Sequence, residues 1–261
     1  MNLICDKNTV ILQPQEYSMQ KENKKWYVSW FNSPYYHILY KKRDHREAAF
    51  FMNNLTRYLE LKKEAKILDL ACGNGRHSKY LFRKGFDVTG LDLSVRNITE
   101  AKQYARPRLK FEVHDMTIPY PDQFDAVFNL FTSFGYFEFE IENLETILAI
   151  KKALKPGGSA VIDFLNVNLA IENMIPYEVI TIDSIDFHIE KKLEDGFIVK
   201  NIRFEDKGKD FFFKERVKAL TLEDFKIYFE EAGVNLQQVF GDYHLNSFND
   251  KTSERLILIF D

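Results

Sequence analysis

The residues best suited to chemistry in this sequence form a strand-to-helix corner near residue 70. A buried-strand pattern ends in Asp69, and Gly73, Asn74 and Gly75 follow before a helical pattern begins at Arg76. Because glycine lacks a Cβ atom, the two glycines allow a ligand to lie against the backbone. The first N–H groups of a helix have no partner within the helix and face that ligand. The corner therefore predicts a small-molecule binding site, and a plain helix-capping role for Asp69 is the less favoured alternative.

A second acidic residue, Asp92, stands at the end of the next predicted strand. It follows the glycine turn at the spacing of roughly 20 residues at which nucleotide-binding folds place an acid that binds ribose. A carboxylate there accepts two hydrogen bonds from vicinal hydroxyls, each contributing about 1.5–3 kcal/mol. Asp92 could instead cap the next helix, but Ser94 already occupies the capping position. The sequence therefore favours a ligand that contains a ribose.

Two classes of cofactor use this geometry. A dinucleotide requires G-x-G-x-x-G, with its pyrophosphate at the helix start, but here Ser78 occupies the third glycine position and Arg76 and His77 crowd the turn. The carboxylate of Asp69, four positions before Gly73, suits a ligand with an ammonium group and no phosphate. S-adenosylmethionine combines a ribose, an adenine, a sulfonium and an amino-acid tail. It is the predicted cofactor, and an NAD-dependent oxidoreductase is the alternative.

Residues 66–165 resemble the class I S-adenosylmethionine-dependent methyltransferases, which have a Rossmann-like fold. The corner resembles their first motif, D/E-x-G-x-G-x-G, with Ala71 in place of the first glycine. Further matches follow in order: the ribose-binding acid Asp92, the adenine segment His114-Asp115-Met116, the fourth-strand signature Phe124-Asp125-Ala126-Val127 that runs to Asn129, and the turn Leu154-Lys155-Pro156-Gly157-Gly158. More loosely, the aromatic segment 26–40 and residues 178–217 resemble parts of small-molecule N- and O-methyltransferases.

The resemblance implies which residues bind S-adenosylmethionine, whose product is S-adenosylhomocysteine. Asp92 is implied for the ribose, Asp115 for the adenine amino group and Met116 for the adenine ring. Tyr36 is added as part of a lid, because a tyrosine face near a sulfonium gains about 0.5–2 kcal/mol, and Arg43 is added for the cofactor carboxylate. Helix packing and a solvated basic face are the alternative roles of these two residues. The full predicted set is Tyr36, Arg43, Asp69, Ala71, Gly73, Asn74, Gly75, Asp92, Leu93, Asp115, Met116 and Asn129.

The elements that position these residues alternate between strands and helices. Strands are predicted over 65–70, 86–93, 109–115, 124–131 and 159–165, with helices over 76–84, from Ser94, and over 142–154. Such alternation is typical of right-handed βαβ units and of a parallel sheet covered on both faces. Residues 234–260 are predicted to pair as two antiparallel edge strands, as the resemblance implies. The predicted fold class is therefore α/β: a seven-stranded, mostly parallel sheet with helices on both faces, an antiparallel C-terminal edge pairing and an inserted antiparallel β layer.

Residues 178–217 interrupt the alternation. They contain three extended segments, separated by turns at 194–196 and 206–208. This layer is expected to wall the acceptor pocket or to mediate a homodimer. Three helix ends are predicted from capping residues: a start at Asp44 with Glu47, a start at Thr221 with Asp224, and an end at Gly233. The predicted organisation is an N-terminal aromatic segment and helix over 1–62, which act as a lid or cap, and a methyltransferase domain over 63–261 with the insertion at about 170–218.

The charge and composition of the chain argue against a nucleic-acid substrate and against membrane association. The net charge of −3 and the pI of about 6.1 give no electrostatic footprint for nucleic acid. The run Asn129-Leu130-Phe131 also lacks the prolines of the D/N-P-P-Y/F motif of base-amine methyltransferases, so DNA is not an expected substrate. The two cysteines fit a reducing compartment, and no run reaches the roughly 18 apolar residues of a membrane span. A cytoplasmic protein is expected, with no membrane association and no metal site.

The predicted function is transfer of a methyl group from S-adenosylmethionine to an N or O atom of a small-molecule acceptor. Direct displacement mainly needs alignment of the reactants, which supplies about 7–11 kcal/mol. A general base would assist a hydroxyl or a protonated amine. No catalytic residue is assigned, and His37, Tyr36 and Asp163 are the candidates considered. An RNA or protein acceptor and a non-catalytic S-adenosylmethionine-binding module stay open as alternatives.

Overall fold

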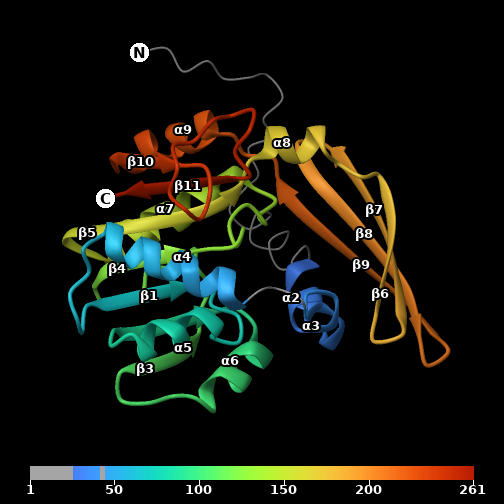
Figure 1. Ribbon diagram of the computed structural model, residues 1–261, viewed down its shortest axis with the longest axis horizontal. Helices are drawn as coiled ribbons and strands as arrows, with labels where there is room; N and C mark the ends of the chain where they lie inside the picture. Colours follow the sequence, from blue (N-terminus) through green and yellow to red (C-terminus); the bar gives the residue numbers. More distant parts are fainter. Residues whose placement is uncertain (1–25, 42–44) are drawn as a thin grey trace, which may run out of the picture.

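The structure, a computed structural model, describes residues 26–41 and 45–261. Its centre is a seven-stranded sheet with the strand order β10-β11-β5-β4-β1-β2-β3 (Figure 1). The strands are β1 Lys66–Leu70, β2 Asp87–Asp92, β3 Leu109–Val113, β4 Phe124–Asn129, β5 Leu154–Leu165, β10 Leu236–Phe240 and β11 Arg255–Phe260. The first five run parallel, whereas β11 is antiparallel to both β5 and β10. This arrangement confirms the predicted α/β fold and its C-terminal edge pairing.

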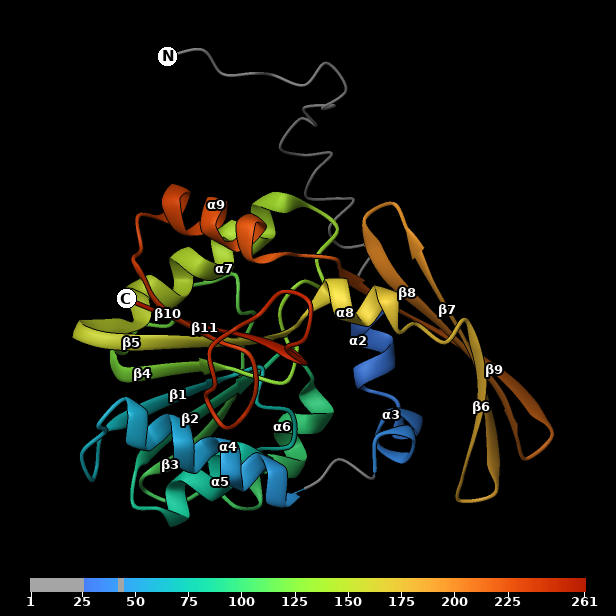
Figure 2. The same ribbon diagram turned by 45° about the horizontal axis from the view of Figure 1, so that its top comes forward.

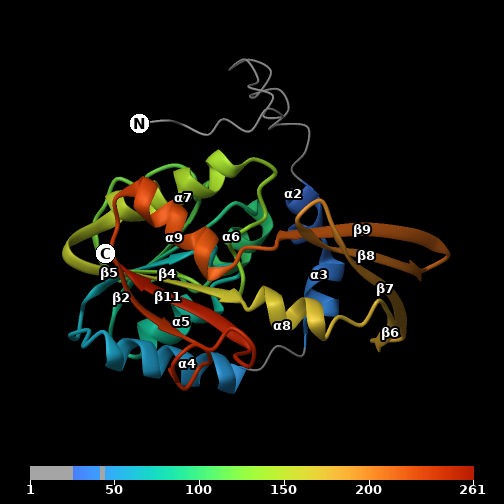
Figure 3. The same cartoon turned by 90° about the horizontal axis from the view of Figure 1, so that it is seen from above.

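Helices cover both faces of this sheet, as the view from above shows (Figure 3). The helices of one face are α4 His45–Tyr58, α5 Arg76–Arg83 and α6 Val95–Lys102, and those of the other are α7 Glu140–Ala153 and α9 Leu222–Ala232. Successive strand residues point to opposite faces. On β1, for example, Ile67 joins the hydrophobic cluster of the first face and Leu68 that of the second. Burial of both faces explains why these strands read as continuous apolar runs.

Capping residues set the helix ends where the sequence indicates them. The Ser94 hydroxyl accepts the N–H of Asn97 at the start of α6. Thr221 and Asp224 form the capping box of α9, and Gly233 ends that helix with a φ of 63°. These predictions are confirmed, whereas Asp44, the predicted start of α4, lies outside the described residues.

The turn predicted at Pro156-Gly157-Gly158 is instead a bulge within β5. This strand begins at Leu154, which pairs with Phe124 of β4, and the next pair along the two strands joins Ser159 to Ala126. The intervening residues leave the ladder, with Gly157 at a φ of 75°. Pairing on both sides of the bulge keeps residues 154–165 in one strand.

Residues 177–218 form a second sheet, antiparallel and separate from the first, which confirms the inserted β layer. It has four strands: β6 Tyr177–Ile182, β7 Ile185–Glu194, β8 Phe197–Asp206 and β9 Lys209–Lys218. The sequence predicted three extended segments, because the turn at Asp183-Ser184 was missed. These residues have φ values of 49° and 65°, the pair of positive angles that a two-residue type I′ hairpin needs. Asp-Ser is a weaker signal for such a turn than Asn-Gly.

Two short helices, α2 Trp26–Phe31 and α3 Pro34–Leu39, lie between the two sheets (Figures 1 and 2). Ser33 caps α3, and Pro34 stands at its first position, where a missing N–H has no cost. Trp30 and Leu39 are buried in one cluster with Phe187 of β7 and Phe204 of β8. The helix α8, Val167–Glu172, leads from β5 to the second sheet. Within the described ranges, no helix is long and apolar enough to cross a membrane.

Candidate functional site

A cavity of about 460 Å³ lies at the carboxyl ends of β1 to β4, where these strands face α2 and α3. Open α/β sheets bind ligands at this edge, and the volume falls within the range of about 300–1,000 Å³ typical of small-molecule sites. The predicted cofactor residues that line it are Tyr36, Ala71, Gly73, Asn74, Asp92, Leu93, Asp115 and Met116. The fold thus brings together predicted residues at the ends of β1, β2 and β3 and a predicted residue of α3.

Four residues of the predicted set are placed elsewhere. Asp69 and Asn129 are buried at the ends of their strands and are not among the lining residues. Gly75 is also absent from the lining and faces Phe111 of β3. Arg43 lies outside the described residues.

Asp92 is held in place by backbone N–H groups. Its Oδ2 accepts the N–H of Gly73 at 2.8 Å, and its Oδ1 accepts the N–H of Ser94 at 2.8 Å. Burial raises the pKa of the Asp92 carboxyl above its ordinary value, and these hydrogen bonds offset part of that rise. Each carboxylate oxygen has two acceptor sites. The side chain is therefore oriented by the protein and still has capacity for ligand hydroxyls.

The two glycines of the corner are required for different reasons: Gly73 borders the cavity, whereas Gly75 packs against β3. Gly73 has a φ of 57°, and an added Cβ would meet no protein atom within 4 Å, so it would project into the cavity. Ala71 also adopts the left-handed region, with a φ of 62°. A residue with a Cβ atom has a conformational energy roughly 1–2 kcal/mol higher in this region. This cost explains why the family motif has glycine at the position of Ala71. At Gly75 an added Cβ would stand 2.4 Å from Phe111 Cε1. Packing against β3 therefore requires that glycine, whereas its predicted contact with the cofactor stays a prediction.

Asp69 anchors the helix that follows the corner. Its carboxylate accepts a hydrogen bond from Ser78 Oγ at 2.5 Å, and the residue is 2% exposed. Burial raises the pKa of Asp69 to about 6, although the hydrogen bonds from Ser78 lower it. The contact ties the end of β1 to the first turn of α5, and Ser78 occupies the position where a dinucleotide motif has its third glycine. Asp69 thus supports the corner from behind the cavity wall.

The buried Asp69 predicts a pH dependence of stability. Its pKa is about 6 in the folded protein against an ordinary 3.8, so the folded state binds this proton more tightly than the unfolded state. The free energy of unfolding therefore falls as the pH rises from about 4 to about 6, by about 3 kcal/mol in total. Asp69→Asn cannot ionise and escapes this loss. Urea unfolding should show the difference between Asp69→Asn and the wild type growing by about that amount over this range; a constant difference would contradict the burial effect.

Hydrogen bonds within the protein hold Asp115, which follows β3 and lines the cavity, and Asn129, which ends β4. Asp115 Oδ1 accepts hydrogen bonds from the N–H and the hydroxyl of Thr117, at 3.1 and 2.9 Å. Asn129 Nδ2 donates to the Leu70 carbonyl at 3.2 Å and lies 3.8 Å from Met116 Sδ. Asn129 Oδ1 is buried and has no hydrogen-bond partner among the described residues. An unsatisfied buried acceptor costs about 1–3 kcal/mol, and Asn129 lies outside the cavity lining.

Aromatic rings form the wall opposite the sheet. The rings come from α2, α3 and the segment after β4: Tyr27, Phe31, Tyr36, Tyr40, Phe131, Tyr136 and Phe137. Tyr136 meets Trp26 and Phe31 edge-on, with centroid distances of 5.6 and 5.4 Å. Sequence reasoning found Tyr36 but missed the rings after β4 and the neighbouring Ser133, which also lines the cavity. The ring-rich run FTSFGYF over 131–137 was the available signal.

Asp163, considered as a base from the sequence, is instead part of a buried ion pair. Its Oδ1 lies 2.7 Å from Arg255 Nη2 and 2.8 Å from Nε, and its Oδ2 accepts the N–H of Phe131 at 2.8 Å. The residue is fully buried and is absent from the cavity lining. Both oxygens are engaged in holding the chain, so Asp163 is a structural group. The other two candidates, Tyr36 and His37, do line the cavity.

Comparisons with known proteins agree with this geometry. Residues 67–158 match the family profile described as Methyltransferase domain. The solved structure of an S-adenosylmethionine-dependent methyltransferase from Clostridium acetobutylicum ATCC 824 aligns with a TM-score of 0.74 at 21% identity, covering 87% of this chain and 95% of that one. Residues 67–158 are therefore similar to methyltransferase domains, and the chain has the fold of the class I S-adenosylmethionine-dependent methyltransferases.

Individual relatives share this region. YqeM of Bacillus subtilis (strain 168), named as a methyltransferase, is 35% identical over 115 residues, which cover 41% of this chain and 46% of YqeM. The ubiquinone biosynthesis O-methyltransferase of Roseobacter denitrificans is 32% identical over 117 residues, covering 41% and 43%. S-adenosylmethionine-bound CalS10, an amino pentose methyltransferase from Micromonospora echinaspora, aligns with a TM-score of 0.62 at 20% identity over 98% of this chain and 99% of CalS10. The chain thus spans less than half the length of the two curated relatives.

Proposed function

We propose that this chain is an S-adenosylmethionine-dependent methyltransferase that transfers the methyl group to an N or O atom of a small-molecule acceptor. The observation that carries the proposal is that Gly73, Asp92, Asp115 and Met116 line one cavity. The names of the O-methyltransferase relative and of the amino pentose methyltransferase support a small acceptor of either kind. In this proposal residues 63–261 are the methyltransferase domain, with the insertion at about 170–218, and residues 1–62 form its cap. A homodimer and a cytoplasmic location stay predictions.

The residues of the cavity fit the cofactor. Asp92 would bind the ribose hydroxyls, Asp115 the adenine amino group and Met116 the adenine ring. The open space beside Gly73 allows a ligand to approach the backbone. Asp69 and Gly75 hold the corner without contacting the ligand, in keeping with their places outside the lining.

Methyl transfer from S-adenosylmethionine requires alignment of the reactants more than catalytic side chains. Bound S-adenosylmethionine supplies a methyl group that its sulfonium has already activated. The protein then aligns the acceptor, which is worth about 7–11 kcal/mol, and excludes water. The rings of α2, α3 and 131–137 would align the acceptor and exclude water, because they close the side of the cavity opposite the sheet. An N–H or O–H acceptor releases its proton as the new bond forms, and no side chain is assigned to receive it.

Replacement of Asp92 tests the cofactor site. Asp92→Ala should weaken binding of S-adenosylhomocysteine at least about tenfold, because the ribose hydroxyls lose the charged acceptor to which they donate. Isothermal titration calorimetry measures this affinity. A matched control is Asp87→Ala, at the opposite end of the same strand and outside the cavity lining, which should bind like the wild type. Unchanged affinity of a folded Asp92→Ala variant would remove Asp92 from the site.

The same titration separates the alternative functions. Binding of NAD with no binding of S-adenosylhomocysteine would overturn the proposal in favour of an oxidoreductase. Co-crystallisation with S-adenosylhomocysteine would show the space left for the acceptor. A cofactor complex whose acceptor side is closed by rings, with no methyl transfer to amines or hydroxyl compounds, would indicate a non-catalytic binding module.

A further inference from the structure

The two short helices α2 and α3 contact both sheets of the molecule. Toward the antiparallel sheet, Trp30 Nε1 donates to Glu215 Oε1 at 2.5 Å, and the Tyr40 hydroxyl donates to the same carboxylate at 2.7 Å. The Tyr35 hydroxyl donates to Asp206 Oδ2 at 2.8 Å, with its ring between Phe204 and Phe211. The helices are thus fixed to β8 and β9 by rings and by hydrogen bonds to carboxylates.

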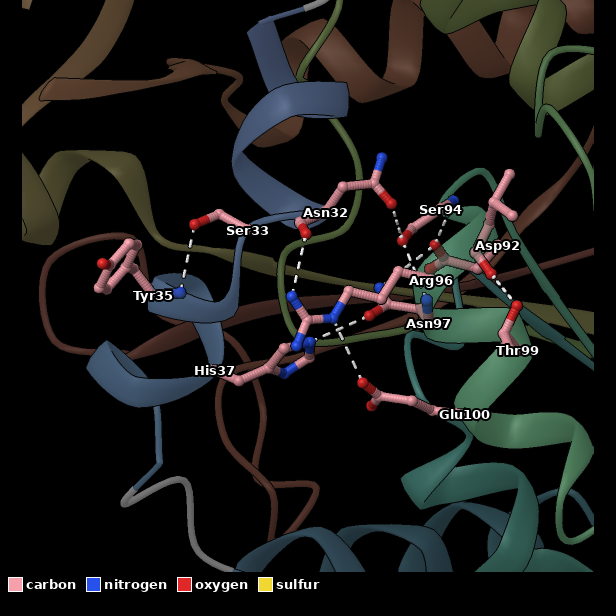
Figure 4. Close-up of polar contacts among 11 residues, drawn as sticks. Asn32, Ser33, Tyr35, His37, Asp92, Ser94, Arg96, Asn97, Thr99 and Glu100 are labelled. Carbon is pink, nitrogen blue, oxygen red and sulfur yellow. Dashed lines mark hydrogen bonds and ion pairs between the residues drawn. The ribbon is translucent and has the colours of Figure 1, made fainter. Parts of the chain in front are cut away.

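Toward the parallel sheet, the same helices reach the carboxylate of Asp92 by two routes (Figure 4). In the first, Asn32 Oδ1 accepts the Ser94 hydroxyl at 2.6 Å, while the Ser94 N–H donates to Asp92 Oδ1. In the second, His37 Nε2 lies 3.1 Å from Asn97 Oδ1, and Asn97 Nδ2 lies 3.5 Å from Asp92 Oδ1. An amide oxygen only accepts, so Nε2 of His37 is the donor.

A third contact fastens the start of α6 to the same turn. Arg96 Nη1 donates to the Asn32 carbonyl at 3.3 Å, and Arg96 Nε pairs with Glu100 at 3.3 Å. Ser94 and Asn97 are both buried, so their orientation depends on these partners. His37 also acts on Asp92 electrostatically, since it lowers the pKa of that carboxyl against the effect of burial.

We propose that Asn32 and His37 are positioning residues for the cofactor: they orient Asp92 through Ser94 and Asn97, so that cofactor affinity depends on how α2 and α3 are seated on the antiparallel sheet. This inference rests on the proposed function, because it assigns Asp92 to the ribose.

The experiment measures S-adenosylhomocysteine affinity by calorimetry in variants of the full chain. His37→Ala should weaken binding about two- to tenfold, the range for loss of one hydrogen bond. His37→Gln keeps an N–H donor for Asn97 and should bind within about twofold of the wild type. Trp30→Phe keeps the ring but removes the donor to Glu215. It should weaken binding in the same direction, although Trp30 is not among the cavity-lining residues.

A double-mutant cycle shows whether His37 acts through Asp92. In an Asp92→Asn background, His37→Ala should have no further effect on affinity, whereas a direct contact of His37 with the cofactor would make the two losses add. Ser29→Ala is the matched control, because Ser29 lies on α2 and its exposed hydroxyl donates within that helix. Circular dichroism confirms that each variant is folded.

The outcomes are distinguishable. A wild-type protein that does not bind S-adenosylhomocysteine would overturn the proposed function itself. Wild-type binding with additive losses, with no loss in His37→Ala, or with no recovery in His37→Gln would overturn only the positioning role. Non-additive losses together with recovery in His37→Gln would establish it.

Discussion

Replacement of Arg255 by methionine should lower the free energy of unfolding by about 3–5 kcal/mol, because it leaves the buried carboxylate of Asp163 without its charged partner. Arg255 reaches that carboxylate through both Nε and Nη2. Its Nη2 also donates to Thr132 Oγ1 at 2.9 Å. Guanidinium chloride unfolding at neutral pH, followed by circular dichroism, measures the loss.

The same ion pair also holds the loop after β4. Phe131 and Thr132 are two consecutive non-glycine residues with positive φ, 57° and 58°. Such angles persist only where the surroundings enforce them. Here the Asp163 side chain accepts the N–H of Phe131, and its carbonyl accepts the N–H of Thr132 at 2.9 Å. Without the ion pair the loop should relax, and Phe131, whose ring stacks on His77 at 4.6 Å, should leave the cavity wall.

A surface arginine provides the matched control. Arg108 pairs with Glu64 at 3.0 Å, but the two side chains are 45% and 76% exposed. Arg108→Met should therefore cost no more than about 1 kcal/mol. Equal losses for the two arginine variants would contradict a special role of the buried pair. Adding Asp163→Leu to Arg255→Met should restore part of the stability, since an apolar pair avoids the buried charge.

The second large effect is expected for Gly73→Ala, which should weaken binding of S-adenosylhomocysteine by about one to two orders of magnitude. The added methyl group has no protein atom within 4 Å, so it occupies cavity space that the cofactor would need. Overpacking of a close contact costs about 1–3 kcal/mol, equivalent to about 5- to 150-fold in affinity. Calorimetric titration at a single salt concentration is the measurement.

Gly85→Ala separates this effect from backbone strain. Gly85 also has a positive φ, 101°, and also has no atom within 4 Å of an added Cβ, but it is not among the cavity-lining residues. Both variants should lose stability, by roughly 1–2 kcal/mol, and only Gly73→Ala should lose affinity. Equal affinity in the two variants would show that the cofactor does not lie against Gly73.

Local features of the sequence predicted the fold and the centre of the site. The corner after β1 and the acid at the end of β2 depend on a few neighbouring residues, and parallel strands bring their carboxyl ends to one edge regardless of the loops between them. Ser94, Thr221 and Gly233 act within one helical turn, so their roles also follow from sequence alone. These are the parts of the molecule in which local preference and tertiary structure agree.

The remaining features depend on contacts between distant segments. The Asp163–Arg255 pair joins residues 92 apart in the chain, and nothing near either residue indicates the other. The same holds for the contact of Tyr136 with α2, and for Gly75, where the Phe111 ring leaves no space for a Cβ atom. The residue types were visible in the sequence, but their partners were set by the topology of the sheet.

The place of β11 has a consequence for the newly made chain. This strand follows the other six strands of its sheet in the chain, yet it lies inside the sheet between β5 and β10. Until it emerges from the ribosome, β5 exposes an unpaired edge that includes Val161 and Ile162, both fully buried in the finished protein. Apolar edges of this kind invite aggregation. Nascent chains that stall before residue 255 should therefore depend on chaperones, whereas a chain that includes β11 covers that edge itself.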